Sequence, residues 1–244
     1  MQTTYFIADL HLTQERQDIT DCFLSFLREQ APKAEKLYIL GDFFEYWVGD
    51  DDDNPFVLSM AKELKALADT GTEIFFIHGN RDFLLGAKYA EKSGMTLLPE
   101  STVIDLYGQK TLIMHGDTLC TNDVQYQKFR KKSRSWWWQL IVKNLPLKVR
   151  KNIANNYRMQ SAEQKSKLKL EIMDVTQSEV ESELQKAKCQ LLIHGHTHRP
   201  NVHQFELNGK QAKRIVLGDW YEQGAWLKVT PESMELLNQP LASS

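Results

Sequence analysis

The stretch His194-Gly195-His196-Thr197-His198 puts three histidines in five residues, directly after the apolar run Gln190-Leu191-Leu192-Ile193. Four more polar clusters occur earlier in the chain, and most of them also follow an apolar run that is typical of a β-strand. Loops at strand ends carry functional side chains on a rigid scaffold, so the clusters predict one site assembled from distant parts of the chain. The four are Asp9-Leu10-His11, Gly41-Asp42, His78-Gly79-Asn80-Arg81-Asp82 and His115-Gly116-Asp117.

Strands alternate with helices along most of the chain, which predicts an α/β fold. Helices are expected at 18–31 and 56–69, where apolar residues recur at helical spacing after an Asp or an Asn-Pro start. The tail from about Asn238 is expected to be disordered. Short runs rich in β-branched or aromatic residues predict strands at about 4–9, 36–41, 73–78, 102–107, 111–115, 190–194, 213–217 and 225–229.

The segment 123–187 interrupts this alternation with an almost wholly helical pattern that breaks at Pro146. It lies between the His115 strand and the His196 strand, so we interpret it as a helical cap or lid inserted into one domain. The core would then consist of residues 1–122 and 188–244. A chain of 244 residues with 42% hydrophobic residues is long enough for one sizeable core.

Charge is distributed unevenly along the chain. Between Lys128 and Lys169 there are thirteen Lys or Arg residues and one acid, Glu163, which leaves −14 for the rest of a chain whose net charge is −2. The same segment contains Trp136-Trp137-Trp138 and further aliphatic residues among its cations. Aromatic and aliphatic residues mixed with cations are typical of a membrane interface. A solvated surface is the plainer interpretation of the charge, and ordinary helix packing that of at least one tryptophan.

The cysteines and the N-terminal segment indicate in which cellular compartment the protein is expected. The cysteines, Cys22, Cys120 and Cys189, are odd in number and far apart, which favours a reducing compartment such as the cytoplasm. The chain enters a strand within a few residues, and no apolar run approaches the length that spans a bilayer. We therefore expect a protein that is neither secreted nor integral to a membrane.

The polar clusters together offer oxygen and nitrogen ligands but no thiolate. Two carboxylates held close to each other would share a proton unless a cation neutralised both. Seven ligands exceed what one tetrahedral zinc needs and suit two five- or six-coordinate ions that share a bridging carboxylate. Manganese, iron or cobalt suits such a site better than zinc, and Mn²⁺ is the metal we expect. Two such ions about 3.5–4 Å apart support hydrolysis of a phosphoester or phosphoanhydride. The predicted ligands are Asp9, His11, Asp42, Asn80, His115, His196 and His198.

The ordered series Asp-x-His, Gly-Asp, Gly-Asn-x-Asp, His-Gly-Asp and Gly-His-x-His resembles the calcineurin-type metallophosphoesterase superfamily. That resemblance implies a four-layer αββα sandwich of two mixed sheets with outer helices. It also implies Asp9, His11, Asp42 and His198 around one metal. Around the other metal it implies Asp42, Asn80, His115 and His196.

Five longer segments of the sequence resemble one family within this superfamily. They are similar to segments of the UDP-2,3-diacylglucosamine pyrophosphohydrolases of lipid A biosynthesis. In that family, water attacks the α phosphorus and releases UMP and 2,3-diacylglucosamine 1-phosphate, lipid X. The matching segments are Ile39-Leu40-Gly41-Asp42-Phe43-Phe44-Glu45, Trp47-Val48-Gly49-Asp50-Asp51, His78-Gly79-Asn80-Arg81-Asp82-Phe83-Leu84, His115-Gly116-Asp117-Thr118-Leu119-Cys120 and Ile172-Met173-Asp174-Val175.

One position departs from the broad superfamily, because Arg81 stands where a histidine usually follows Gly-Asn. A phosphate leaving group departs as an anion and gains more from a fixed cation than from a proton donor. Arg81 therefore favours a pyrophosphate substrate. With Arg81, we expect Asn80 and His196 to act in catalysis and to contact the substrate. By the family resemblance, Asp123, Arg158 and Ser161 match substrate-facing positions of the cap, and Lys165 and Lys167 match polar or basic ones.

Three functions remain open from the sequence. The first is the lipid-nucleotide pyrophosphohydrolase, acting as a monomer that associates peripherally with the cytoplasmic face of the bacterial inner membrane. The second is a soluble phosphodiesterase or nucleotide pyrophosphatase of the same superfamily. The third is a non-catalytic membrane adaptor, against which the complete ligand set argues. Nucleic acid is not expected as a partner, because apolar residues in the cap outnumber the stacking and polar groups of a strand-binding groove.

Several polar residues of the clusters have plainer roles. We expect His78, His194 and His203 to be hydrogen-bonded structural residues. Asp82 and Asp117 are expected to orient ligands, not to bind metal themselves. The acidic run 50–53 is expected to form a turn and the start of the next helix before Pro55.

Overall fold

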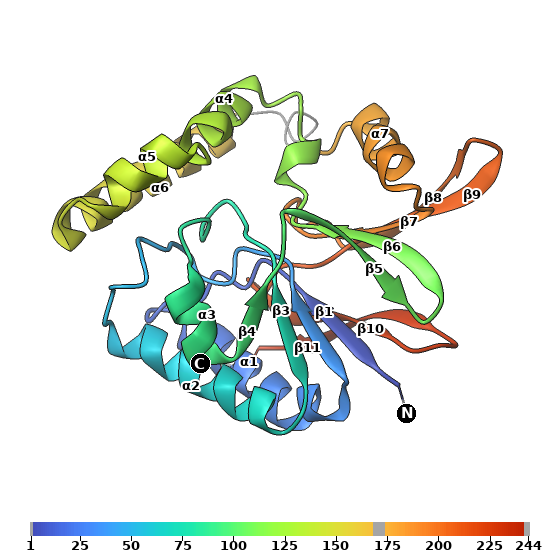
Figure 1. Ribbon diagram of the computed structural model, residues 1–244, viewed down its shortest axis with the longest axis horizontal. Helices are drawn as coiled ribbons and strands as arrows, with labels where there is room; N and C mark the ends of the chain where they lie inside the picture. Colours follow the sequence, from blue (N-terminus) through green and yellow to red (C-terminus); the bar gives the residue numbers. More distant parts are fainter. Residues whose placement is uncertain (1, 168–173, 242–244) are drawn as a thin grey trace.

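Two β-sheets pack face to face at the centre of the molecule, and helices cover their outer faces (Figure 1). The computed structural model describes residues 2–167 and 174–241, with the main chain alone for 158–167. The predicted four-layer αββα fold with two mixed sheets is confirmed.

The first sheet has six strands in the order β11-β10-β1-β2-β3-β4. β1 to β4 run parallel, and β10 and β11 complete the sheet in antiparallel pairing. The carboxyl ends of the four parallel strands therefore meet at one edge. The strands are β1 Thr4–Ile7, β2 Lys36–Ile39, β3 Glu73–Phe76, β4 Met95–Leu97, β10 Gln223–Val229 and β11 Met234–Pro240.

The second sheet has five strands in the order β5-β6-β7-β9-β8. Its three central strands, β6, β7 and β9, run parallel, while β5 and β8 pair antiparallel at the two edges. Each sheet thus presents a row of parallel strand ends. The strands are β5 Ser101–Leu106, β6 Gln109–Met114, β7 Leu191–His194, β8 Asn201–Leu207 and β9 Lys210–Val216.

Alternating side chains of β1 show how the layers are built. Tyr5 and Ile7 face the outer helices and join their apolar cluster, whereas Phe6 and Ala8 face the second sheet. This period of two buries both faces of the strand, as expected for a parallel strand at the centre of a layered fold. The helices on this side are α1 Gln17–Glu29, α2 Pro55–Asp69 and α3 Ala87–Ser93.

Helices fill the described part of segment 123–187, and they divide into two groups. α7, Gln177–Ala187, packs Val180 and Leu184 against the outer face of the second sheet and so supplies the fourth layer. α4 Val124–Ser133, α5 Trp136–Lys143 and α6 Leu147–Lys167 lie together on the other side of the molecule (Figure 1). α6 begins directly after Pro146, where the break was predicted. We refer to α4, α5 and α6 as the cap helices.

Salt bridges join the cap helices to the core. The Arg150 guanidinium is buried, forms a two-pronged pair with Asp51 and also donates to the main-chain oxygen of Val48 at 2.7 Å. Lys151 lies 3.0 Å from Asp52. The predicted turn at 50–53 is present. Its acidic residues also bind the basic residues of α6, and the two-pronged pairing of a carboxylate with a buried guanidinium fixes the geometry of that contact.

Several local predictions were wrong. The predicted strands at 4–9, 36–41 and 73–78 end two residues earlier, because the chain turns sharply out of the sheet there. The hairpin of β8 and β9 was missed, although its Asn208-Gly209 turn, with φ of 53° and 73°, is a strong hairpin signal. β4 was also missed, and the tail expected to be disordered from Asn238 continues β11 as far as Pro240.

Replacing Leu184 by Ala tests whether α7 is a structural layer of the core. The side chain is fully buried, so its loss should lower the free energy of unfolding by about 2–5 kcal/mol, measured by urea denaturation. Lys186→Ala, on the exposed side of the same helix, is the control and should change it by less than about 0.5 kcal/mol. Equal small effects from both variants would contradict the packing of α7.

Candidate active site

The predicted ligands all follow the carboxyl ends of parallel strands. Asp9 and His11 come after β1, Asp42 after β2 and Asn80 after β3. His115 follows β6, while His196 and His198 follow β7 in the second sheet. Open α/β sheets place their sites at such strand ends, and here the ends of two facing sheets contribute to a single one.

One half of the site gathers Asp9, His11, Asp42 and His198. The Nε2 atoms of His11 and His198 are 3.5 Å apart. His198 Nε2 is 3.4 Å from Asp9 Oδ1, and His11 Nε2 is 3.8 Å from Asp42 Oδ2. We call this group site one.

The other half gathers Asn80, His115 and His196 around the second oxygen of Asp42, and we call it site two. His115 Nε2 lies 3.1 Å from Asn80 Oδ1 and 3.2 Å from His196 Nδ1. It lies 3.8 Å from Asp42 Oδ1. The structure therefore brings all seven predicted ligands together, with Asp42 directing one oxygen toward each site. Their binding of metal stays a prediction.

Main-chain conformation sets the direction of these side chains. Eight non-glycine residues of the described chain have positive φ, and the five at the site have values between 50° and 70°. This left-handed region is costly for most L-residues, and Asn, Asp and His are enriched among those that adopt it. Strained conformations of this kind cluster at functional sites. The five are Asp9, His11, Asp42, His196 and His198.

Glycine at position 79 is required by the close approach of two loops. A Cβ atom on Gly79 would lie 2.2 Å from Asp42 Oδ1 and 2.3 Å from the Asp42 nitrogen. Any side chain would therefore displace the carboxylate that stands between the two sites. The Gly-Asn pair in the third cluster thus serves packing as well as ligand chemistry.

Buried charge at the site fits a divalent cation. Asp9 is fully buried, and its Oδ1 accepts no hydrogen bond. Burial by itself would raise the pKa of the Asp9 carboxyl. The facing histidines, among which His198 has the largest effect, outweigh burial and lower this pKa below its ordinary value. Burial lowers the pKa of His198, and the neighbouring Asp9 and Asp219 outweigh that effect and raise it to about 10. A buried carboxylate oxygen without a hydrogen bond, among mixed O and N donors, suits a divalent metal ion.

Hydrogen bonds from outside the ligand set hold it in place. His115 Nδ1 donates to the Leu40 oxygen at 2.8 Å, which leaves Nε2 directed at the site. Asp9 Oδ2 accepts the His196 N–H at 2.7 Å, so the first cluster orients the last. Asp82 accepts the main-chain N–H groups of Phe43 and Gly79, as expected for a residue that orients ligands.

Asp117 connects the cap helices to the site. Its Oδ2 accepts hydrogen bonds from the Tyr126 hydroxyl at 2.5 Å and from Arg130 Nε at 2.8 Å. The Tyr126 ring centroid lies 6.0 Å from that of His196. Because Tyr126 and Arg130 belong to α4, Asp117 ties the cap helices to the edge of site two.

Two acids beside site one were not among the predicted site residues. Glu45 Oε2 lies 3.0 Å from His11 Nδ1, and Asp219 Oδ2 lies 3.4 Å from His198 Nδ1. Carboxylates behind ligating imidazoles fix ring orientation and raise basicity. A signal for Asp219 was present, since Leu217-Gly218-Asp219 repeats after β9 the Leu-Gly-Asp that follows β2.

The remaining histidines of the polar clusters are structural. His78 Nε2 lies 2.7 Å from the Leu85 oxygen, away from the site. His194 is fully buried between the Gly195 oxygen and Arg214, and burial and the Arg214 charge lower its pKa to about 3. It is therefore neutral, as a satisfied core histidine should be.

The predicted substrate contacts of the cap stay predictions. Asp123 is the N-cap of α4, and its Oδ1 accepts the Tyr126 N–H at 2.9 Å. The side chains predicted at Arg158, Ser161, Lys165 and Lys167 lie outside the described part of the structure. Arg81 belongs to the site, since its main-chain N–H donates to Asp42 Oδ1 at 2.8 Å.

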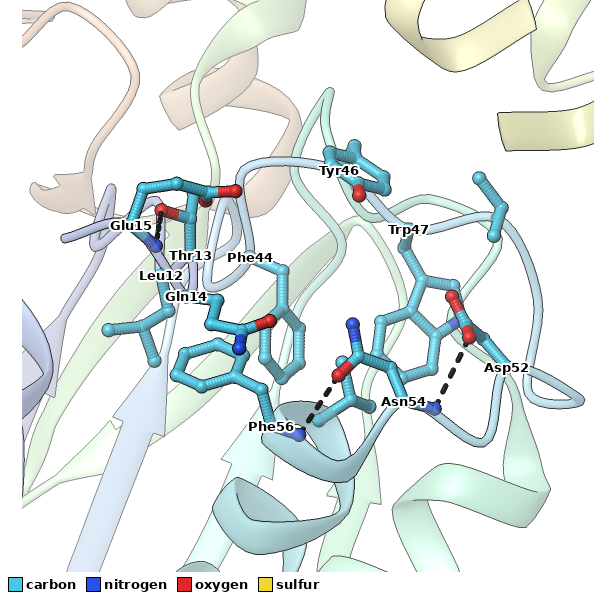
Figure 2. Close-up of a pocket in the computed structure, with 12 residues that line it drawn as sticks. Leu12, Thr13, Gln14, Glu15, Phe44, Tyr46, Trp47, Asp52, Asn54 and Phe56 are labelled. Carbon is cyan, nitrogen blue, oxygen red and sulfur yellow. Dashed lines mark hydrogen bonds between the residues drawn. The ribbon is translucent and has the colours of Figure 1, made fainter. Parts of the chain in front are cut away.

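A pocket lies beside the site-one loops, between residues 12–15 and 44–57 (Figure 2). Its wall is aromatic, with Phe44, Trp47 and Phe56, and its rim carries Thr13 and Glu15. Asn54, which caps α2 through the Phe56 N–H, faces it as well. Neighbouring side chains point in different directions here: Glu45 contacts His11, whereas the adjacent Phe44 lines the pocket and packs in the core.

Residues 3–200 match the family model described as calcineurin-like phosphoesterase. The chain belongs to the calcineurin-like phosphoesterase family. It is accordingly a hydrolase, and members of this family of metallophosphoesterases use divalent metal, in agreement with the ligand cluster described above.

Curated relatives match over nearly the full chain. A Vibrio parahaemolyticus protein named UDP-2,3-diacylglucosamine hydrolase is 52% identical over 98% of both chains. An Escherichia coli O7:K1 protein of the same name is 54% identical over 97% of this chain and 99% of its own. Among solved structures, an archaeal phosphodiesterase matches with a TM-score of 0.50 and 14% identity, over 98% of this chain and all of its own. That last likeness concerns the fold alone.

Replacing Asp42 by Ala should weaken metal binding at both sites and lower turnover far more than tenfold, because one carboxylate faces both. Metal content after dialysis and hydrolysis of an aryl phosphodiester measure the two effects. Asp69→Ala removes an exposed carboxylate from the end of α2 and should change neither. More than a tenth of wild-type activity in the Asp42 variant would contradict the bridging role.

Proposed function

We propose that this hydrolase cleaves the pyrophosphate bond of UDP-2,3-diacylglucosamine, giving UMP and 2,3-diacylglucosamine 1-phosphate, lipid X, in lipid A biosynthesis. The observation that carries the proposal is the pair of ligand groups around Asp42 in a chain about half identical to proteins named for this substrate. Water would attack the α phosphorus, on the uridine side of the bond.

Two Mn²⁺ ions are the proposed cofactor. Asp9, His11, Asp42 and His198 would hold one ion, and Asp42, Asn80, His115 and His196 the other. When bound, such ions supply an ionised water at neutral pH and neutralise charge on phosphate oxygens. The protein contributes a partly buried ligand set whose direction is held by the main chain and by Asp82, Glu45 and Asp219.

Arg81 is the proposed clamp for the departing phosphate. Its Nε is buried and has no hydrogen-bond partner in the described structure, while its main chain is tied to Asp42. A guanidinium held beside the site with a free donor can pair with a phosphate oxygen and stabilise the negative charge as the bond breaks. Asn80 and His196, on the same side of Asp42, would contact the phosphates as well.

The cap is proposed to hold the diacylglucosamine part. Asp123 lies at the start of α4, within the helix that contacts site two through Tyr126. One of its oxygens caps the helix, and the other is left for a sugar hydroxyl or amide. Arg158, Ser161, Lys165 and Lys167 complete the proposed contacts on α6.

Exposed apolar side chains on α5 support association with a membrane. Trp136 is 77% exposed and Trp137 44%, and Leu140 and Ile141 are more than half exposed beside them. Trp138 instead packs near Phe83, as predicted for at least one of the three tryptophans. Exposed apolar groups beside cations suit the interface of an anionic bilayer. We propose a monomer that binds the cytoplasmic face of the inner membrane peripherally.

No described helix has both the length and the hydropathy needed to cross a bilayer.

Metal-free protein should not hydrolyse UDP-diacylglucosamine, and added Mn²⁺ should restore release of UMP. An aryl phosphodiester is the control substrate and should be cleaved far less efficiently, because it offers nothing for the cap to hold. Separation of UMP and lipid X by chromatography measures the reaction. Cleavage of the aryl diester alone would retain the metal chemistry and reject the proposed substrate.

Replacing Trp136 and Trp137 together by Ala should weaken binding to liposomes that contain anionic lipid by at least tenfold. Each of these exposed side chains would contribute about 1.5–3 kcal/mol of binding free energy when the lipid buries it. Binding should also decrease with added salt. Co-sedimentation measures both effects. Val202→Ala removes an apolar residue of β8 that is about as exposed as Trp137 and is the control. Unchanged binding in the tryptophan variant would reject α5 as the membrane contact.

A further inference from the structure

The ring of Tyr221 covers the ligands of site one. Its centroid lies 5.3 Å from that of His11 at an interplanar angle of 19°, and 5.9 Å from that of His198. The residue nevertheless keeps 41% of its surface exposed. An aromatic ring that is stacked on one side and open to solvent, directly beside a phosphate-processing centre, offers a flat face to a ligand.

The main chain around Tyr221 is fixed at three points. The preceding Trp220 is fully buried among aromatic rings of the core. Its main-chain N–H donates to the main-chain carbonyl oxygen of Asp9 at 3.2 Å. The Arg16 guanidinium donates to the main-chain carbonyl oxygen of Tyr221 at 2.8 Å, and it also pairs with both carboxylate oxygens of Asp18. A ring placed on such a support costs little conformational entropy when a ligand stacks on it.

The two sides of the site differ in what surrounds them. Site two lies under α4, where Tyr126 is partly buried and hydrogen-bonded to Asp117 beside His196. Tyr221 lies at site one and is open to solvent. A pyrophosphate bound between the sites would direct one substituent toward the cap and the other toward Tyr221. Since the cap is the side proposed for the lipid, the substituent over site one is the nucleoside.

We infer that the exposed face of Tyr221 is a stacking platform for the pyrimidine base of the substrate. The inference rests on the proposed function for the identity of the base, and on the geometry of Tyr221 for its location. Stacking of a base on an aromatic side chain is worth a five- to hundredfold change in affinity and does not require hydrogen bonds to the base edge. Tyr221 would thus determine affinity for the nucleotide and leave the cleavage chemistry to other residues.

Binding of UMP and of ribose 5-phosphate to the Mn²⁺-loaded enzyme, measured by calorimetry, tests the platform. Both carry a ribose and a phosphate, and only UMP carries a base. The wild type should bind UMP about tenfold more tightly than ribose 5-phosphate. Tyr221→Ala should remove that preference with the affinity for ribose 5-phosphate unchanged, and Tyr221→Phe should retain it.

Tyr157→Ala is the matched control, because Tyr157 is 42% exposed and lies on α6; it should keep the preference for UMP. Equal weakening of UMP and ribose 5-phosphate in Tyr221→Ala, with reduced manganese content, would make Tyr221 a support for His11 and overturn the inference. An unchanged preference for UMP in Tyr221→Ala would overturn it too.

Hydrolysis of UDP-diacylglucosamine by the wild type separates this inference from the proposed function. If the wild type hydrolyses the lipid and Tyr221→Ala keeps its preference for UMP, the platform alone is wrong. If the wild type does not hydrolyse the lipid but loses its preference for UMP in Tyr221→Ala, the platform stands and the proposed substrate is wrong.

Discussion

Two carboxylates, Asp9 and Asp42, are buried at the ends of neighbouring strands, and the rest of the site follows from that constraint. Buried negative charge is tolerated only where positive partners or a cation compensate it. Imidazoles from the second sheet face both carboxylates, and the main chain adopts left-handed conformations that direct them inward. The local strain is sustained because two packed sheets hold the loops from both sides.

The same electrostatic logic extends to the cap helices. A segment with twelve excess positive charges docks on a core with fourteen excess negative charges, and Arg150 and Arg130 make that docking specific through Asp51, Asp117 and Glu100. Basic residues that face the core are therefore structural, and only the rest are available for lipid or phosphate. With its charges committed in this way, the cap leaves the apolar face of α5 in solvent, a feature that a self-contained helical bundle would bury.

The site has two unlike sides. Site two is bordered by α4 and its partly buried Tyr126, whereas site one is bordered by the exposed Tyr221, two acids and the rim of the pocket beside Thr13 and Glu15. A substrate whose two halves differ as strongly as a nucleoside and a diacylated sugar matches that asymmetry. Members of one hydrolase family can share the metal chemistry at the strand ends and differ in these borders, since function depends on the site and its surroundings more than on the fold.

The ligand clusters and most of the strands were predictable, because apolar runs ending in Asp, His and Asn have a local signature and the order of motifs is specific. The pairing of edge strand β4 with β3 had no such signature, because helix α3 separates the two strands in the chain. The same holds for Asp219, Glu45, Tyr126 and Tyr221, whose roles depend on which histidine each one meets. The sequence by itself determined which residues could bind metal; only the tertiary structure decided which oxygen of Asp42 faces which site, because that depends on how two sheets bring their strand ends together.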